Sequence, residues 1–82
     1  SMIEDGIFDG DYIFVKRQPS ARKGQIVAAM VDGEATVKRF FPEGDRIRLQ
    51  PANSAMEPIY IHASQALDTS ILGLVIGVFR RV

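Results

Sequence analysis

The sequence predicts an all-β domain, a compact and mostly antiparallel fold with several short strands and hairpins. Short runs rich in Val, Ile, Phe and Tyr recur between clusters of Gly, Pro, Asp and Asn, which is typical of strands separated by turns. No segment shows a strong helical periodicity. A chain of 82 residues can build one hydrophobic core but not two, so we expect a single domain over residues 1–82.

Six segments are expected to form strands. In chain order they are Tyr12–Lys16, Gln25–Val31, Glu34–Phe40, Arg46–Gln50, Pro58–His62 and Ile71–Arg80. The last segment is long for a strand, and Gly73 or Gly77 could interrupt it. A turn is expected at residues 9–11 and a loop at residues 51–58, which begins and ends with proline.

Two connections predict how the middle strands pair. Asp32-Gly33 tolerates the positive φ angles of a two-residue hairpin turn, so the strands on either side of it should be antiparallel neighbours. Residues 41–45 carry a proline and a glycine where we expect the strand to stop, and they return the chain into Arg46–Gln50. Three strands in meander order are therefore expected.

Composition excludes several classes of protein. Ten basic residues balance ten acidic ones, so the chain lacks the positive excess of a nucleic-acid-binding surface. With no cysteine, a disulfide framework or thiolate metal site is impossible, and we expect no cofactor and no metal. The longest apolar run, residues 71–79, is far shorter than the roughly 20 residues of a membrane-spanning helix. No signal peptide pattern is present, and we expect a soluble, cytoplasmic protein without membrane contact.

The single histidine argues against a histidine-based active site. His62 has no cysteine and no second histidine to join it, and catalytic or metal sites need such clusters. A structural or exposed role for His62 is therefore favoured over a Ser-His-Asp triad. In Ser-Lys hydrolases, a lysine takes the place of the histidine.

Lys38 is the lysine best placed to act as a base. Lys16 and Lys23 lie beside arginines in polar stretches, whereas strand alternation puts Thr36, Lys38 and Phe40 on one face of the second hairpin arm. If that face points inward, desolvation lowers the pKa of the amine, and the Thr36 hydroxyl could orient it. Periodicity alone favours the simpler alternative of a lysine whose amine reaches water along the sheet.

The first residue, Ser1, could be either a remnant of an expression tag or a functional serine. Five segments decide between them when they are taken in order: Ser1–Ile7, Asp9–Asp11, Asp32–Arg39, Arg46–Asn53 and Met56–Ile59. Their order and spacing resemble the catalytic domain of the LexA/UmuD family of self-cleaving Ser-Lys peptidases. The resemblance covers essentially the whole chain and favours a functional Ser1.

The resemblance implies both a fold and site residues. It implies a compact β fold, which agrees with the strand prediction. It also implies that Ser1 is the nucleophile with its own backbone N–H in the oxyanion hole, that Lys38 is the general base and that Thr36 orients the lysine. Signal peptidases share this architecture more distantly, but they carry a membrane anchor and usually a proline soon after the Ser-Met pair, whereas Ile3-Glu4 stands here.

The same resemblance implies an SOS-response repressor that cleaves its own interdomain Ala-Gly bond when a RecA–single-stranded-DNA filament stimulates it. Operator DNA would be bound only by an N-terminal domain outside this sequence. A UmuD-like polymerase accessory protein and a phage-type repressor domain that only dimerises are the alternatives, as is a β-rich interaction module. The segments VKRF and RIRLQPAN favour the repressor.

The C-terminal strand is the expected homodimer interface. Residues 71–79 are long and apolar, and an exposed edge of that kind invites pairing with another chain. The resemblance implies dimerisation through this region. The residues expected there are Val75, Ile76, Val78, Phe79 and Arg80. A buried central strand is the alternative, and the sequence leaves the two open.

Overall fold

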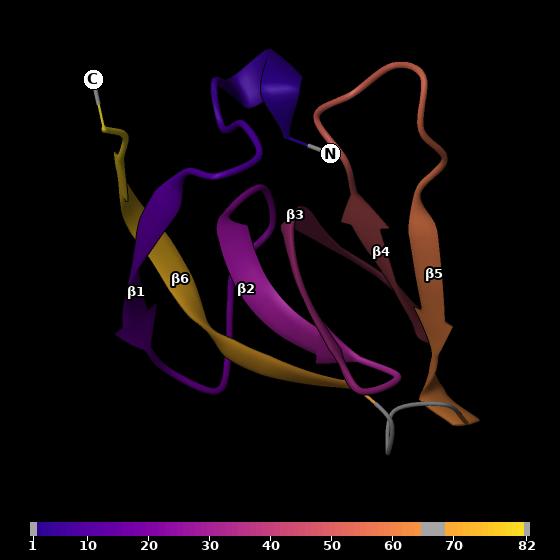
Figure 1. The fold of residues 1–82 in the computed structure, drawn as a ribbon. Helices are drawn as coiled ribbons and strands as arrows, with labels where there is room; N and C mark the ends of the chain where they lie inside the picture. Colours follow the sequence, from indigo (N-terminus) through magenta and orange to yellow (C-terminus); the bar gives the residue numbers. More distant parts are fainter. Residues whose placement is uncertain (1, 65–68, 82) are drawn as a thin grey trace.

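One antiparallel sheet of six strands forms the domain in the computed structural model, which describes residues 2–64 and 69–81 (Figure 1). A single turn of 3-10 helix precedes the strands. The elements are η1 (Ile3–Asp5), β1 (Tyr12–Arg17), β2 (Ile26–Val31), β3 (Glu34–Glu43), β4 (Arg46–Gln50), β5 (Ile59–His62) and β6 (Thr69–Phe79). The all-β prediction is confirmed. The strands lie in the order β1-β6-β2-β3-β4-β5.

The hairpin of β2 and β3 is confirmed, and its turn explains its register. Asp32 has φ 49° and Gly33 has φ 82°, so both central residues adopt the positive φ of the mirror-image turn. The ladder then runs from Val31 opposite Glu34 to Ile26 opposite Arg39. This register places Lys38 directly opposite Val27 on the same face of the sheet.

The prediction that the strand stops near Phe40 is wrong. β3 continues to Glu43, with Pro42 opposite Ile47 of β4, and the turn consists only of Gly44 and Asp45. Proline has a φ that a strand accepts, and its missing N–H excludes it only from positions that must donate to the ladder. The residue that turns the chain is Gly44, with φ 64°.

β6 is continuous through both of its glycines, so neither Gly73 nor Gly77 interrupts the strand. Its pairing instead skips one residue on each side. Phe14 and Val15 of β1 face Gly77 and Val75, and a similar shift against β2 leaves Leu72 as an extra residue. Ile76 is therefore the extra residue against β1, and β-bulges of this kind increase the local twist of a sheet.

The position of β6 combines features of the two interpretations of the C-terminal strand, because it lies between β1 and β2 in the sheet but is paired with both at once over a short stretch. β2 pairs with the strand from Thr69 to Leu74 and β1 pairs with it from Gly73 to Phe79, so of the described residues only Gly73 and Leu74 have a paired strand on both sides. β2 ends its ladder at Val27 opposite Leu74, while β6 runs on to Phe79 with β1 as its partner. Among the described residues, Val75–Phe79 thus has a paired strand on one side only.

The hydrophobic core lies on the face of the sheet that carries Lys38. Its buried members are contributed by four consecutive strands of the sheet: Val27, Ala29, Phe40, Leu49 and Ile61. Met2 is also buried and brings the start of the chain against the end of this sheet. Within residues 2–64 and 69–81, no helix is long and apolar enough to cross a membrane.

Candidate active site

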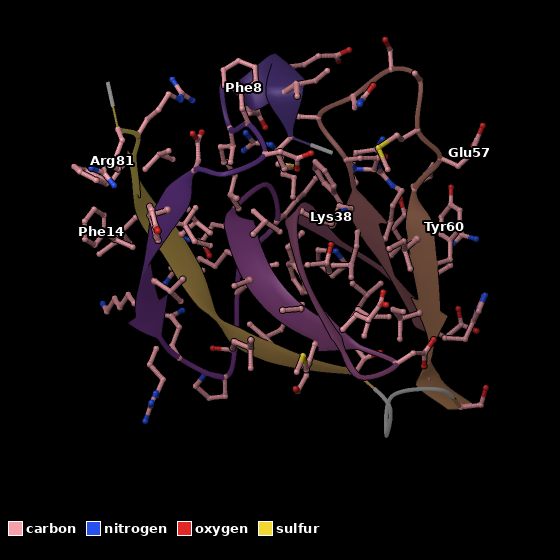
Figure 2. All side chains as sticks on the ribbon, in the orientation of Figure 1. Phe8, Phe14, Lys38, Glu57, Tyr60 and Arg81 are labelled. Atoms are coloured by element: carbon pink, nitrogen blue, oxygen red, sulfur yellow. The ribbon has the colours of Figure 1, made fainter. Side chains whose placement is uncertain are left out.

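Lys38 points inward from the middle of β3 (Figure 2). Only 5% of the residue is exposed, and it is the one charged residue that is buried as a whole, backbone included, in the part of the chain that the structure describes. Val27, fully buried, lies opposite it, and Phe40 follows it on the same face. The face of Thr36, Lys38 and Phe40 is therefore the core face.

Two oxygens of its own strand accept hydrogen bonds from the Lys38 amine. The Nζ atom lies 2.6 Å from Thr36 Oγ1 and 3.2 Å from the carbonyl oxygen of Val37. Strand geometry explains the first contact, because residues two apart share a face. The amine is thus held at a defined point on the core face and is not extended into solvent.

Burial changes the acid–base behaviour of this lysine. Desolvation disfavours the ammonium form and lowers the pKa of the Lys38 amine below its ordinary value. A larger fraction of the amine is then neutral near neutral pH than for an exposed lysine. A neutral amine held in place can accept a proton, which is the role of a general base.

The segment after Met2 is attached to the 51–54 loop by several hydrogen bonds. The Glu4 N–H donates to the Ala52 carbonyl at 2.7 Å. The backbone N–H and the hydroxyl of Ser54 donate to the Glu4 carboxylate at 2.8 and 2.9 Å, and the backbone hydrogen bond is the main cause of the lowered pKa of Glu4. These contacts fix η1 above the end of the sheet.

The strand that carries Lys38 also contacts η1 directly. Arg39 lies on the opposite face of β3 from Lys38, and its guanidinium forms an ion pair with Asp5 at 2.8 Å. The same side chain donates to the Gly24 carbonyl. Consecutive residues of β3 therefore place an amine on the core face and link the strand to the beginning of the chain.

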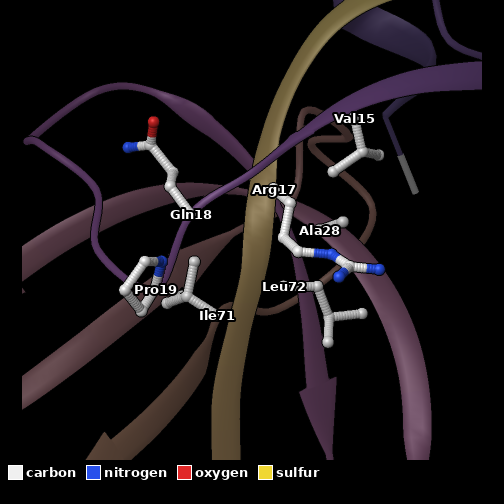
Figure 3. A pocket seen from close by; sticks show the side chains of 7 residues that line it. All are labelled: Val15, Arg17, Gln18, Pro19, Ala28, Ile71 and Leu72. Carbon is white, nitrogen blue, oxygen red and sulfur yellow. The ribbon is translucent and has the colours of Figure 1, made fainter.

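A groove beside Thr36 lies between the N-terminal segment and β3. It has a volume of about 290 Å³ and is lined by Met2, residues 7–11 and Ile13 together with Ala35, Thr36 and Val37. A larger hollow of about 750 Å³ lies elsewhere, where Arg17, Pro19 and Leu72 surround the crossing of β6 and the loop after β1 (Figure 3). Met2 and Thr36 line the groove but not the larger hollow, so the groove is the better candidate for substrate.

Comparison with known proteins agrees with this geometry. The family model described as Peptidase S24-like matches residues 1–76. The chain belongs to the Peptidase S24-like family. It is 60% identical over 82 residues to a LexA repressor of Myxococcus xanthus, covering 100% of this chain and 37% of that protein. A LexA repressor of Caldicellulosiruptor saccharolyticus is also 60% identical over 82 residues, which are 100% of this chain and 38% of the relative.

This S24-like domain spans a little over a third of the length of the curated relatives it matches. The family resemblance inferred from the sequence is confirmed. Thr36 and Lys38 are brought together by the structure, whereas Ser1 lies outside the described residues. The catalytic roles of these three residues remain proposals.

The expected interface residues of the S24-like domain lie at the end of β6. Ile76 is 65% exposed, Phe79 is 50% exposed and Val78 is 42% exposed. Val75 is half-buried. Arg80 differs from them, because its guanidinium binds Asp11 of the same chain.

Several contacts of the site were not predicted from the sequence. Arg39 and Asp5 are 34 residues apart, and Arg80 and Asp11 are 69 residues apart. Hydrogen bonds from Arg80, and next from the Phe8 N–H, are the main causes of the lowered pKa of Asp11. Periodicity reports only local neighbours, so no signal in a single sequence pairs these charges.

Proposed function

We propose that this chain is the catalytic and dimerisation domain of an SOS-response transcriptional repressor that cleaves its own interdomain Ala-Gly bond. The observation that carries the proposal is the buried Lys38, whose amine is bound to Thr36 Oγ1 at 2.6 Å. Membership of the S24-like family and similarity to LexA repressors support it. The 82 residues contain no Ala-Gly pair, so the proposed bond belongs to another part of the protein.

The proposed reaction begins with a proton transfer. Neutral Lys38 Nζ takes the proton of Ser1 Oγ while that oxygen attacks the scissile carbonyl carbon, and the carbonyl oxygen becomes an oxyanion. Backbone N–H groups stabilise the oxyanion, that of Ser1 among them. The C–N bond then breaks, and the Lys38 ammonium returns its proton to the leaving amine.

Water completes the proposed reaction. Lys38, neutral again, takes a proton from a water molecule as it attacks the acyl-enzyme ester. The ester C–O bond breaks, and the proton passes to Ser1 Oγ as the new carboxyl group leaves. Thr36 keeps the amine in position throughout, because its hydroxyl accepts from an ammonium and donates to a neutral amine.

Dimerisation is proposed through the end of β6. Val75–Phe79 has a paired strand on one side only in the described chain, and Ile76, Val78 and Phe79 are exposed. Two copies related by a two-fold axis would present this surface to each other. The remaining parts of the proposal are a cytoplasmic location, stimulation by a RecA–single-stranded-DNA filament and operator binding by a further domain.

The relatives favour a repressor over a UmuD-type accessory protein. The chain is only 37% of the Myxococcus xanthus LexA repressor and 38% of the Caldicellulosiruptor saccharolyticus one. The relatives therefore have room for a separate DNA-binding domain. A UmuD-type protein would instead carry a short arm.

Self-cleavage of the full-length protein tests the proposal. Fragments are followed by gel and mass spectrometry between neutral pH and about pH 10, with and without the RecA filament. Ser1→Ala and Lys38→Met should each lower the rate by about 10⁴-fold or more, as loss of a nucleophile or its base does in serine hydrolases. Lys38→Met keeps most of the side-chain volume, and circular dichroism checks the fold. Unchanged cleavage in either folded variant would disprove the dyad.

A further inference from the structure

The loop that follows η1 is attached to the end of the chain through one buried carboxylate. The side chain of Asp11 is 3% exposed. Its oxygens accept from Arg80 Nε at 2.7 Å and from the Phe8 N–H at 2.8 Å, and the second oxygen also forms an ion pair with Arg80 Nη2. A two-point contact between a guanidinium and a carboxylate fixes both distance and orientation.

Arg80 makes two further contacts with the same loop. Its Nη2 donates to the carbonyl oxygen of Gly6 at 2.9 Å, and its guanidinium carbon lies 4.6 Å from the centre of the Phe8 ring. Figure 2 shows Phe8 beside η1, above the end of the sheet. One side chain, directly after β6, therefore holds Gly6, Phe8 and Asp11 together.

The contacts of Gly6 extend to the start of the chain. The N–H of Gly6 donates to the Ile3 carbonyl at 3.0 Å, and the N–H groups of Asp5 and Ile7 donate to the Met2 carbonyl at 3.0 and 3.1 Å. Met2 through Ile7 thus form one hydrogen-bonded turn. A shift of the Gly6 carbonyl would move the backbone next to residue 1.

We propose that Arg80 is a positioning residue for self-cleavage, because it fixes the Gly6–Asp11 loop and with it the backbone that follows the nucleophile. The inference rests on the proposed function. Lys38 comes from β3, whereas the nucleophile precedes η1, so their relative position depends on contacts between separate elements. Arg39 and Asp5 connect them by an ion pair whose side chains are 35% and 27% exposed. Arg80 is itself 51% exposed, but the Asp11 side chain that it binds is only 3% exposed, and Arg80 makes more contacts than Arg39 does with the N-terminal segment.

The test compares self-cleavage of full-length Arg80→Ala, Arg80→Lys and Asp11→Asn proteins at alkaline pH without the RecA filament. Arg80→Ala should lower the rate at least about tenfold, since small misplacements of reacting groups have effects of that size. The pH midpoint should not move, because Lys38 keeps its surroundings. Arg80→Lys keeps the charge but not the two-point contact, so it should restore only part of the rate. Arg81→Ala, at the exposed neighbouring residue, is the matched control and should cleave normally.

A double variant separates positioning from general destabilisation. If Arg80 acts through Asp11, the Asp11→Asn/Arg80→Ala protein should be little slower than the slower single variant, because residues in one contact are not additive. Rates are measured below the unfolding temperature and are divided by the amount of folded protein. They are measured at several protein concentrations, so that a change in dimerisation is not mistaken for a change in the cleavage step. Normal cleavage by folded Arg80→Ala would overturn the inference, as would a normal rate in both Arg80→Lys and Asp11→Asn. Absence of cleavage in the wild type would instead contradict the proposed function.

Discussion

Two effects of opposite sign act on the amine of Lys38. Burial disfavours its charged form, while the Thr36 hydroxyl and the Val37 carbonyl accept hydrogen bonds from it. The carbonyl can only accept, but the hydroxyl can also donate to a neutral amine. Of these two acceptors, Thr36 is therefore the one that suits both protonation states of a base.

Replacing Thr36 tests this role of the hydroxyl. Thr36→Val removes the partner while keeping the shape, and the rate of self-cleavage by the full-length protein should fall about tenfold or more. This is less than the roughly 10²-fold or more that the acid–base group itself contributes, because Thr36 acts through Lys38. Thr36→Ser keeps a hydroxyl and should retain most of the rate. Equal rates in the Val and Ser variants would show that the hydroxyl has no such role.

The lowered pKa of Lys38 also predicts how stability depends on pH. Between the lowered folded value and the ordinary value of 10.5, the unfolded chain binds the proton that the folded chain has lost. The contribution of Lys38 to the free energy of unfolding should therefore become more favourable as pH rises through that window. Below it, the buried charge should make the wild type less stable relative to Lys38→Met.

Chemical denaturation of both proteins at a series of pH values measures this difference. The free energy of unfolding of Lys38→Met is subtracted from that of the wild type at each pH. The difference no longer contains the titration of groups that the two proteins share. As pH rises toward 10.5, the wild type should gain free energy of unfolding relative to Lys38→Met. A constant difference over that range would show that the Lys38 pKa is the same in both states.

At the scale of single residues, the sequence predicts neighbours that strand alternation brings together. Thr36 and Lys38 were placed on one face because they are two apart in a strand, and the hydrogen bond between them follows from that spacing. The role of Arg80 was not predictable in this way. It depends on Asp11, which only the folded chain brings near.

At the scale of elements, β6 connects the two parts of the sheet. Gly73 lies opposite both Arg17 of β1 and Ala28 of β2. A Cβ atom at Gly73 would collide with the backbone carbonyl oxygen of Lys16, whereas one at Gly77 would meet the Phe14 ring at 3.3 Å. Backbone cannot move aside as a side chain can, so Gly73 is required for the close approach of β1 and β6.

The two glycines give a matched pair of variants. Gly73→Ala should lower the free energy of unfolding by about 2 kcal/mol or more, in the range of overpacked cores, and Gly77→Ala by less than about 1 kcal/mol. Urea denaturation compares them directly. A smaller effect at Gly73 than at Gly77 would contradict the packing described for β6.

Residues that accept a positive φ predict where a strand ends better than a proline does. Asp32-Gly33 predicted the β2–β3 turn because few residues accept positive φ at both positions. Pro42 suggested that β3 stops, but the strand continues to Glu43. Whether a proline breaks a strand depends on where its N–H would point, and that is set by pairing with β4.

At the scale of the whole molecule, the strand order is the feature that the sequence predicts least well. β6, the last strand, lies between β1 and β2 and joins the two ends of the chain in one sheet. Local patterns predict the β2–β3–β4 meander but not this long-range pairing. The same arrangement brings Arg80 to the N-terminal loop and leaves Val75–Phe79 paired on one side.

The dimer proposal predicts a change in self-association. Ile76→Asp places a charge on an exposed apolar residue of the proposed interface and should weaken the dimer at least tenfold, about 1.4 kcal/mol. Analytical ultracentrifugation of the full-length protein measures the dissociation constant. Met56→Asp, at an exposed apolar residue outside the strands, is the control and should associate normally. Equal association of both variants would place the interface elsewhere.

The central claim is that a buried lysine acts as the base for self-cleavage, and its titration tests this most directly. The pKa of Lys38 is measured by NMR on Ser1→Ala protein with labelled lysine side chains, and the cleavage rate of the wild type is measured over the same pH range. The account predicts a midpoint below the ordinary 10.5 in both measurements, and that the two midpoints coincide. A Lys38 that titrates as an ordinary exposed lysine, or a rate that rises at a different pH, would contradict it.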